Sequence, residues 1–171
     1  MTKTLLLAAL ATATLAQPAL SQSAAATEDA VSETDAALPA TVLDQWLEDP
    51  AQVFDATTSV PEDFLWRARP LVVFADSPFD PNFQEQMDLL TSRIDELVER
   101  DVVILVDTDP ANPSALRTRL RPRGFMLALI GKDGGVKLRK PLPWDVRELS
   151  RSIDKMPIRQ QEIRDRRGSD G

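Results

Sequence analysis

The sequence predicts an α/β domain in which a central mixed sheet carries helices on both faces. Three apolar runs, at residues 70–75, 102–106 and 125–130, have the length and β-branched content of strands buried on both sides. An amphipathic segment lies between the first two runs, and this strand–helix–strand order predicts a parallel, right-handed unit. An Asp-Gly turn within residues 131–135 predicts a hairpin after the third run. These three observations together predict the α/β class.

The segment before the first strand is predicted to hold one short helix. Apolar residues between Val42 and Leu47 recur at helical spacing, so ordered structure should begin near Leu38. Residues 49–63 contain proline and aspartate and predict a loop. We expect three tryptophans to pack in the core or against loops, namely Trp46, Trp66 and Trp144.

A helix follows the first strand. Asp80 and Pro81 provide an N-cap residue and a first helical residue. One apolar stripe then runs from Phe83 to Leu97 and predicts a single helix that reaches about Arg100. The second strand begins directly afterwards.

The C-terminal half predicts a short helix, a hairpin and a last helix. A cap at residues 112–113 precedes the short helix. Residues 136–140 alternate between apolar and basic residues, as in an edge strand with one face in water. Asp145, with Glu148 three residues later, predicts a capping box, and Pro157 should interrupt the helix that follows. This order of elements is the topology of the thioredoxin fold, with a parallel pair, an antiparallel hairpin and a closing helix.

The N-terminus has the features of a secretory leader. Lys3 precedes an apolar run that ends at Ala11, and small residues at Ala19 and Ser21 suit cleavage. A membrane-spanning helix needs about 20 consecutive apolar residues, so this run is too short and we expect no transmembrane segment. We therefore expect residues 1–21 to be a signal peptide and the mature protein to be periplasmic or secreted.

Three segments are expected after the leader. Residues 22–37 are small, polar and acidic, which predicts a flexible linker. Residues 38–160 should form the thioredoxin-like domain. Residues 161–171 are expected to be a polar tail that frays.

The composition removes several classes of chemistry. The chain has no cysteine, so thiol redox chemistry and disulfides are excluded. It has no histidine, so the most common general base and metal ligand in proteins is absent. We therefore expect no cofactor and no catalytic residues, and a binding module rather than an enzyme.

Charge is distributed unevenly along a chain whose net charge is −7. Residues 22–66 carry ten acids and no base, whereas residues 114–167 carry fifteen bases and six acids. Nucleic acid is not an expected partner of an acidic, exported protein. The basic half instead predicts a surface for an anionic protein, glycan or lipid headgroup. The residues predicted to form this surface are Arg117, Arg121, Lys132, Lys137 and Arg139.

A purely structural role is the alternative interpretation of the same basic residues. Lysine and arginine protect an edge strand against aggregation, and the acidic N-terminal segment could neutralise them. The same stretch also contains Arg119, Arg123 and Lys140, which do not belong to the predicted binding set.

Three aspartates support a second functional hypothesis. Asp76, Asp107 and Asp109 follow two parallel strands, at the sheet edge where open α/β sheets bind ligands. Clustered carboxylates could hold Ca²⁺ or Mg²⁺, which prefer oxygen ligands, so a metal-binding protein or metal-dependent enzyme is the alternative function. Aspartate is also common in turns after strands, and a purely structural role is the competing interpretation.

Several motifs, in a consistent order, resemble one known family. They are residues 66–75, residues 83–86, residues 99–103, Gly124-Phe125, residues 131–139 and Met156-Pro157. The chain resembles the bacterial exported family called domain of unknown function 4174 over about residues 60–165. That family is similar to thioredoxin and peroxiredoxin folds and is related to domains of animal extracellular-matrix proteins. The resemblance implies the fold and leaves the function open, because no activity is established for the family.

Two departures from thioredoxin-like enzymes argue against a redox role. Where those enzymes carry the reactive cysteine, this chain has residues 76–81, which contain no thiol. Those enzymes also usually carry a proline directly before the third core strand. Here Gly124 stands at that position, since residues 122–125 read Pro-Arg-Gly-Phe. A non-catalytic interaction module is therefore the function that the sequence favours.

Overall fold

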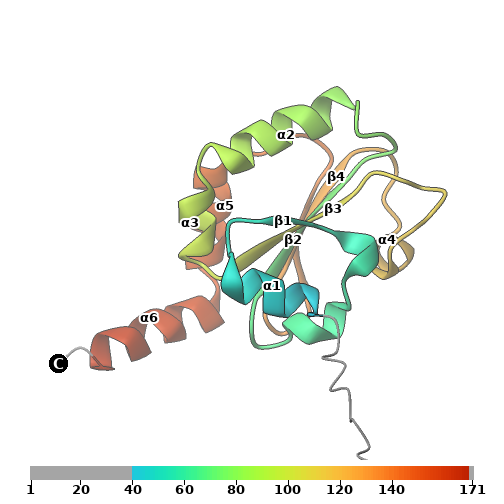
Figure 1. Ribbon diagram of the computed structural model, residues 1–171. Helices are drawn as coiled ribbons and strands as arrows, with labels where there is room; N and C mark the ends of the chain where they lie inside the picture. The colour runs from blue at the N-terminus through green and yellow to red at the C-terminus, as the bar shows by residue number, and fades with distance from the viewer. Residues whose placement is uncertain (1–39, 170–171) are drawn as a thin grey trace, which may run out of the picture. The chain divides into compact units, whose positions relative to one another are not determined.

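The computed structural model describes residues 40–169, and its centre is a five-stranded mixed sheet (Figure 1). The strands are β1 (Val53–Asp55), β2 (Arg69–Phe74), β3 (Val102–Asp107), β4 (Met126–Ile130) and β5 (Val136–Lys140). Their order in the sheet is β1-β3-β2-β4-β5. β3 pairs in parallel with both β1 and β2, whereas β4 pairs antiparallel with both β2 and β5.

Helices cover both faces of this sheet. They are α1 (Val42–Glu48), α2 (Pro81–Thr91), α3 (Ile94–Val98), α4 (Ala115–Leu120), α5 (Val146–Asp154) and α6 (Pro157–Ser169). Two short 3-10 helices cover Ala56–Thr58 and Pro61–Phe64. In Figure 1, α2, α3 and α5 lie on one face and α1 and α4 on the other. No helix within residues 40–169 is long and apolar enough to cross a bilayer.

This architecture confirms the predicted thioredoxin-like α/β class. It contains the parallel strand–helix–strand unit, the C-terminal hairpin and the closing helix, with helices on both faces. The predicted leader at residues 1–21 and the predicted linker at residues 22–37 lie outside the described residues.

Alternate residues of β2 enter two separate cores. Leu71 and Val73 pack in the core formed with α2, α3 and α5, whereas Val72 and Phe74 pack in the core formed with α1 and α4. Successive side chains of a strand point to opposite faces, and all four are fully buried. Burial of each such side chain stabilises the fold by about 1.5–3 kcal/mol, so β2 contributes to both layers of the domain.

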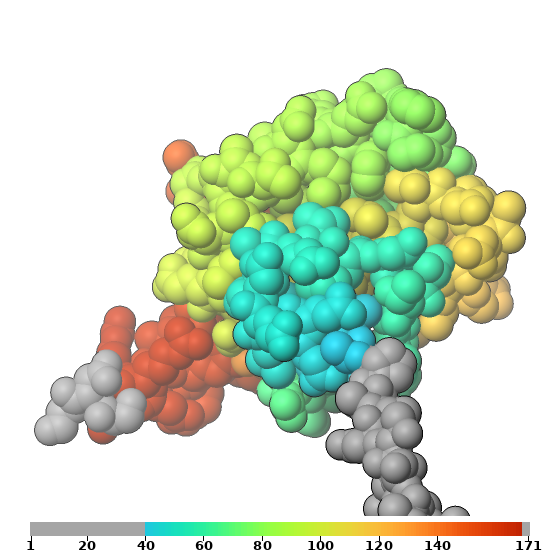
Figure 2. Space-filling model, in the orientation of Figure 1, coloured from blue at the N-terminus to red at the C-terminus, as the bar shows by residue number. Residues whose placement is uncertain are grey.

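Two of the three tryptophans pack as predicted. Trp46 is buried, and its Nε1 donates a hydrogen bond of 3.3 Å to the Val102 carbonyl beneath α1, which covers this face in Figure 2. Trp144 packs against the core formed with α2, α3 and α5. The prediction is wrong for Trp66, which is 69% exposed and has a left-handed φ of 62°. Its backbone N–H donates to the Lys132 carbonyl at 2.7 Å, which holds this turn against the hairpin.

Strand β1 lies where the sequence predicts a loop. Only Val53–Asp55 pair with β3, opposite Ile104–Val106. A strand this short carries no recognisable alternation of apolar and polar residues. Its pairing with the longer β3 is what makes it a strand.

The helix predicted to run from Pro81 to about Arg100 is two helices, α2 and α3. At the end of α2 the Thr91 hydroxyl donates to the Met87 carbonyl at 2.8 Å, and the Ser92 hydroxyl donates to the Leu89 carbonyl at 2.9 Å. Such side-chain bonds to the backbone compete with helix continuation. The apolar stripe continues across the break, which is why the pattern predicts one helix.

The C-terminal helices also differ in detail from prediction. Asp145 caps α5 as expected, but Glu148 pairs with Arg151 at 2.6 Å instead of completing a capping box. Pro157 interrupts the chain after α5 and is also the first residue of α6, where its missing N–H needs no partner. The segment predicted to fray after residue 160 is helical as far as Ser169.

Two glycines with left-handed backbones provide a test of the turn geometry. Gly134 has a φ of +74°, and an added Cβ would lie 2.9 Å from Leu65 Cδ2, whereas Gly124 has a φ of +67° and open space around it. Gly124→Ala is expected to lower the free energy of unfolding by about 1 kcal/mol, the cost of the left-handed conformation alone. Gly134→Ala should lower it by about 2 kcal/mol, because Leu65 must also move. Urea denaturation measures both; equal losses would show that Leu65 yields without cost.

Candidate functional site

The strand-end aspartates are organised by an arginine. Arg117 projects from α4, and its Nε donates to Asp107 Oδ1 at 2.7 Å. Its Nη2 donates to the Ala75 carbonyl at 2.6 Å and to the Asp107 carbonyl at 2.8 Å. The Arg117 and Asp107 side chains are only 9% and 1% exposed. Arg117 therefore joins the ends of β2 and β3 as a buried structural residue, and it is not part of an exposed binding surface.

The structure does not support the metal-binding alternative. Asp107 is neutralised by Arg117, and Asp76 is 61% exposed and lies 3.5 Å from Arg117 Nη1. Asp109 accepts a hydrogen bond of 2.9 Å from the Ala111 N–H and closes a turn. Among residues 40–169, no group of three or more acidic side chains is arranged to hold a metal ion. The Arg117 guanidinium supplies the positive charge that the metal-binding alternative assigns to a metal ion.

Two more of the predicted basic residues are engaged in ion pairs. Lys132 Nζ lies 2.9 Å from carboxylate oxygens of both Asp101 and Glu162. Lys137 Nζ lies 2.6 Å from Asp133 Oδ2. Three of the five predicted residues, including Arg117, are thus paired with acidic residues.

Arg121 and Arg139, in contrast, line one pocket of about 280 Å³, together with two basic residues outside the predicted set, Arg123 and Lys140. We call this opening the basic pocket. Its apolar lining residues are Phe125, Met126 and Pro141. No acidic side chain lines it, and none of its four basic residues forms an ion pair within the described part of the chain.

Local structure positions these basic residues. Arg121 ends α4 with a left-handed φ of 49°, which turns the chain toward β4. Arg139 Nη1 donates to the Leu120 carbonyl at 3.2 Å and links β5 to the end of α4. Lys140 Nζ lies 4.2 Å from the centroid of the Trp144 ring, a cation–π contact.

The Trp144 backbone is itself fixed by a buried amide. Gln86, fully buried on α2, donates to the Trp144 carbonyl at 3.1 Å and accepts from the Trp144 N–H at 2.7 Å. The two bonds satisfy both polar atoms of the Gln86 side chain in the protein interior. They also hold the loop after β5, and thereby one side of the basic pocket.

The basic pocket lies at the carboxyl-terminal end of β2. Met126, which lines it, pairs with Phe74, the last residue of that strand. Open α/β sheets bind ligands at this edge. The residues that line this pocket belong to the basic half that the sequence singled out. The sequence did not separate Arg123 and Lys140 from their basic neighbours, because the pocket forms only when the α4–β4 loop meets β5.

A second group of charges, which we call the α6 network, attaches α6 to the sheet. Arg69, the first residue of β2, is 1% exposed, and its Nη2 donates to Glu162 Oε1 at 2.8 Å. Its Nη1 donates to the Arg100 carbonyl at 2.8 Å and lies 3.6 Å from Asp101 Oδ2. Buried Arg159 lies 3.5 Å from Glu162 Oε2. The α6 network thus connects α6 with β2, with the α3–β3 turn and, through Lys132, with the hairpin.

Glu162 is ionised within this network. Burial of its carboxyl opposes ionisation, but hydrogen bonds from Lys132 and Arg69 outweigh that effect and hold its pKa below the usual value of 4.5. The carboxylate is therefore the charged partner of Arg69, Lys132 and Arg159 at neutral pH.

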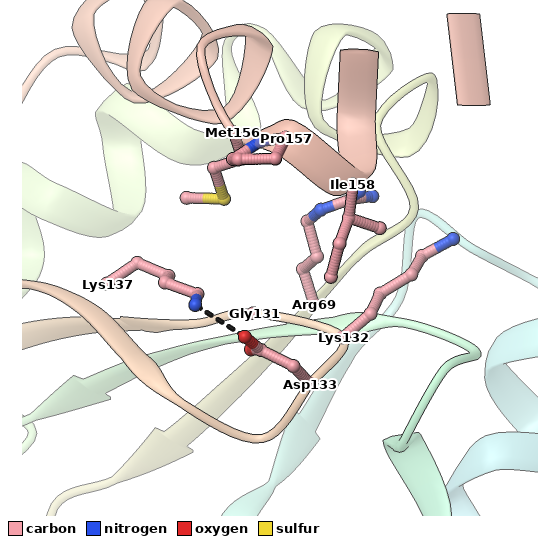
Figure 3. Close-up of a pocket in the computed structure, with 8 residues that line it drawn as sticks. All are labelled: Arg69, Gly131, Lys132, Asp133, Lys137, Met156, Pro157 and Ile158. Carbon is pink, nitrogen blue, oxygen red and sulfur yellow. Dashed lines mark hydrogen bonds and ion pairs between the residues drawn. The ribbon is translucent and has the colours of Figure 1, made fainter. Parts of the chain in front are cut away.

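A pocket of about 220 Å³ lies beside the α6 network, and we call it the α6 pocket (Figure 3). Met156, Pro157 and Ile158 form one side of it, where α5 passes into α6. Lys137 and Asp133, joined by their ion pair, lie on the opposite side in Figure 3. The hydrogen bond from Lys137 is the main cause of a lowered pKa at Asp133, so this carboxylate is charged as well.

Fold and composition together define a thioredoxin-like domain that has neither cysteine nor histidine. The chain belongs to the family described as "Domain of unknown function (DUF4174)", whose sequence model matches residues 60–162. This match confirms the family resemblance that the sequence motifs indicated.

The chain is also similar to named proteins. It is 32% identical over 130 residues to Coiled-coil domain-containing protein 80 of Danio rerio, a match that covers 58% of this chain and 15% of that protein. Thioredoxin peroxidase I of Plasmodium yoelii matches in structure with a TM-score of 0.42 and 17% identity, over 58% of this chain and 79% of that chain. A Plasmodium yoelii Prx1a modified at the N-terminus matches with a TM-score of 0.43 and 18% identity, over 59% and 80% of the two chains.

Proposed function

We propose that this protein is an interaction module whose basic pocket binds an acidic segment of a partner protein. The observation that supports the proposal is the convergence of Arg121, Arg123, Arg139 and Lys140 on one opening that no carboxylate of the described residues lines. Four like charges around one opening repel one another, and a bound anion removes that repulsion. Each guanidinium also presents a planar fork of donors that matches the two oxygens of a carboxylate.

A strand edge beside the pocket favours a protein segment over other anions. β5 is the last strand of the sheet, and it supplies Arg139 and Lys140. An edge strand offers unpaired backbone groups to which an extended peptide can add. An acidic peptide could use both the charges and the strand edge, whereas a lipid headgroup or a glycan could use only the charges.

The double variant Arg121→Gln/Arg139→Gln is expected to bind a short oligoglutamate peptide about tenfold more weakly than the wild type, since each exposed charge pair contributes up to about 1 kcal/mol. Fluorescence anisotropy of a labelled peptide at low salt measures the affinity. Wild-type binding should weaken as salt is raised, because the Debye length falls from about 30 Å at 0.01 M to about 10 Å at 0.1 M.

A second double variant controls for net charge. Arg164→Gln/Arg167→Gln removes the same charge from exposed positions on α6 and should bind the peptide as the wild type does. Equal losses in the two double variants would show that overall charge, and not the basic pocket, attracts the peptide. Tighter binding to phosphatidylserine vesicles or to a sulfated polysaccharide than to the peptide would contradict a protein segment as the partner.

A further inference from the structure

The α6 pocket shares no lining residue with the basic pocket and differs from it in chemistry. The basic pocket is surrounded by cations that have no ion-pair partner among residues 40–169. The α6 pocket combines an apolar wall of Met156, Pro157 and Ile158 with charges that are already paired. A ligand for this second pocket must therefore bring both an apolar body and a polar head.

A glycine shapes the floor of the α6 pocket. A Cβ on Gly131 would lie 2.5 Å from Lys137 Cε and 2.6 Å from Asp133 Oδ1, so only glycine lets the lysine side chain lie across the turn. The backbone of Gly131 is not left-handed, so its lack of a side chain reflects this close approach and not a special φ. The ammonium group of Lys137 lies at the pocket and points toward the Asp133 carboxylate in Figure 3.

Lys137 is the cation best placed to receive the head of a ligand. Arg69 and Lys132 also line the pocket, but both bind Glu162 of the buried α6 network. Within residues 40–169, the one ion pair of Lys137 is with Asp133 at the solvent-exposed turn, and an ammonium has three N–H donors. Because Asp133 occupies only part of the three N–H donors of Lys137, the ligand head that this ammonium favours is a hydrogen-bond acceptor with a negative charge.

The volume limits the size of the apolar body. An apolar cavity of about 150 Å³ holds benzene, and drug-sized ligands fill pockets of about 300–1,000 Å³. The α6 pocket, at about 220 Å³, lies between these values. It therefore has room for one ring or a short chain, together with a small head group.

From these features, we propose that the α6 pocket is a binding site for a small monocarboxylate with an apolar body, such as a one-ring aromatic acid. The ring lies against Met156 and Ile158, and the carboxylate accepts hydrogen bonds from Lys137. This site would be separate from the anion site at the basic pocket, and neither proposal depends on the other.

The methionines give each pocket its own methyl signal in an NMR spectrum. Met156 lines the α6 pocket, Met126 lines the basic pocket, and Met87 packs on α2 as an internal reference. Protein labelled with ¹³C at the methionine methyl groups is titrated with benzoate, benzyl alcohol and benzylamine. We expect benzoate to shift the Met156 signal in a saturable manner, benzyl alcohol to shift it with at least about tenfold weaker affinity, and benzylamine to leave it unchanged.

Two variants test the assignment. Gly131→Ala, whose added methyl group displaces Lys137, should abolish the benzoate shift at Met156 while the unchanged Met87 signal shows that the protein is folded. Lys137→Gln should remove the preference for benzoate over benzyl alcohol, and the control Arg147→Gln, at an exposed site on α5, should keep it. No shift at Met156, a shift at Met126 alone, or equal binding by wild type and Gly131→Ala would overturn the proposal.

Discussion

Arg117→Met is expected to lower the free energy of unfolding by about 3–5 kcal/mol, because it removes one partner of a buried ion pair and leaves the other without a counter-charge. The pair is short, 2.7 Å from Arg117 Nε to Asp107 Oδ1, and the Asp107 side chain is almost completely buried. The carbonyls of Ala75 and Asp107 lose a donor in the same variant. An unsatisfied buried acceptor adds to the loss. The shift in the urea midpoint, followed by circular dichroism, measures the change.

A double variant separates the role of charge from that of packing. Arg117→Met/Asp107→Leu replaces both partners by apolar groups, a change that is often neutral in other buried pairs. We expect it to recover a large part of the stability lost by Arg117→Met, but not all of it, because the Ser114 N–H donates to Asp107 Oδ2 at 3.1 Å. Exposed Arg147→Met should change stability by less than about 0.5 kcal/mol. A loss below about 1 kcal/mol for Arg117→Met would contradict a buried, stabilising pair.

The elements that form both cores could be predicted because their burial leaves a pattern in the sequence. β2, β3 and β4 are continuous apolar runs, and the stripes of α2 and α5 recur at helical spacing. Topology followed from the order of these elements alone. β1 could not be predicted, since three residues carry no period and its pairing with β3 is decided in three dimensions.

Charged residues were the hardest to place from sequence. Arg117 follows Leu116 on a helix whose inward face is short, and nothing in that pattern shows that its guanidinium reaches back to Asp107. For a related reason, the sequence predicts a polar tail where the structure has α6. Its contacts with the domain include buried Arg159 and the ion pairs of Glu162, so an apolar stripe does not mark its inner face. A polar segment looks like a solvated tail until its partners are known.

The same difficulty explains the outcome for the basic residues. Five basic residues were predicted to form one surface, yet three of them bind acidic residues of the domain. The acidic partner is 10 positions away in the chain for Arg117, 31 positions away for Lys132 and only 4 positions away for Lys137. Sequence charge counts cannot distinguish a cation with an internal partner from one without. Arg121 and Arg139 share a pocket because the α4–β4 loop and β5 meet at the end of the sheet.

Glu162→Gln is expected to lower the free energy of unfolding by about 3 kcal/mol at neutral pH, because charged hydrogen bonds to Arg69 and Lys132 are lost together. Arg69 is then left at 1% exposure with Asp101 at 3.6 Å as its nearest remaining carboxylate. Hydrogen exchange should show the loss in α6, whose amides are expected to exchange faster than those of β2 or β3. Asp165→Asn, which removes an exposed carboxylate from the same helix, should have little effect.

The pH dependence of this effect has a definite sign. The pKa of Glu162 is lower in the folded protein than its usual value of 4.5, so the unfolded chain takes up the proton first as the pH falls. The contribution of Glu162 to stability is therefore fully present above the usual pKa and disappears as the pH falls through the lower, folded value. The stability difference between the wild type and Glu162→Gln should be constant near neutral pH and shrink below about pH 4.5. A difference that stayed constant at acidic pH would show that the carboxylate charge does not hold α6 on the domain, and that packing of Arg159 and Ile158 does.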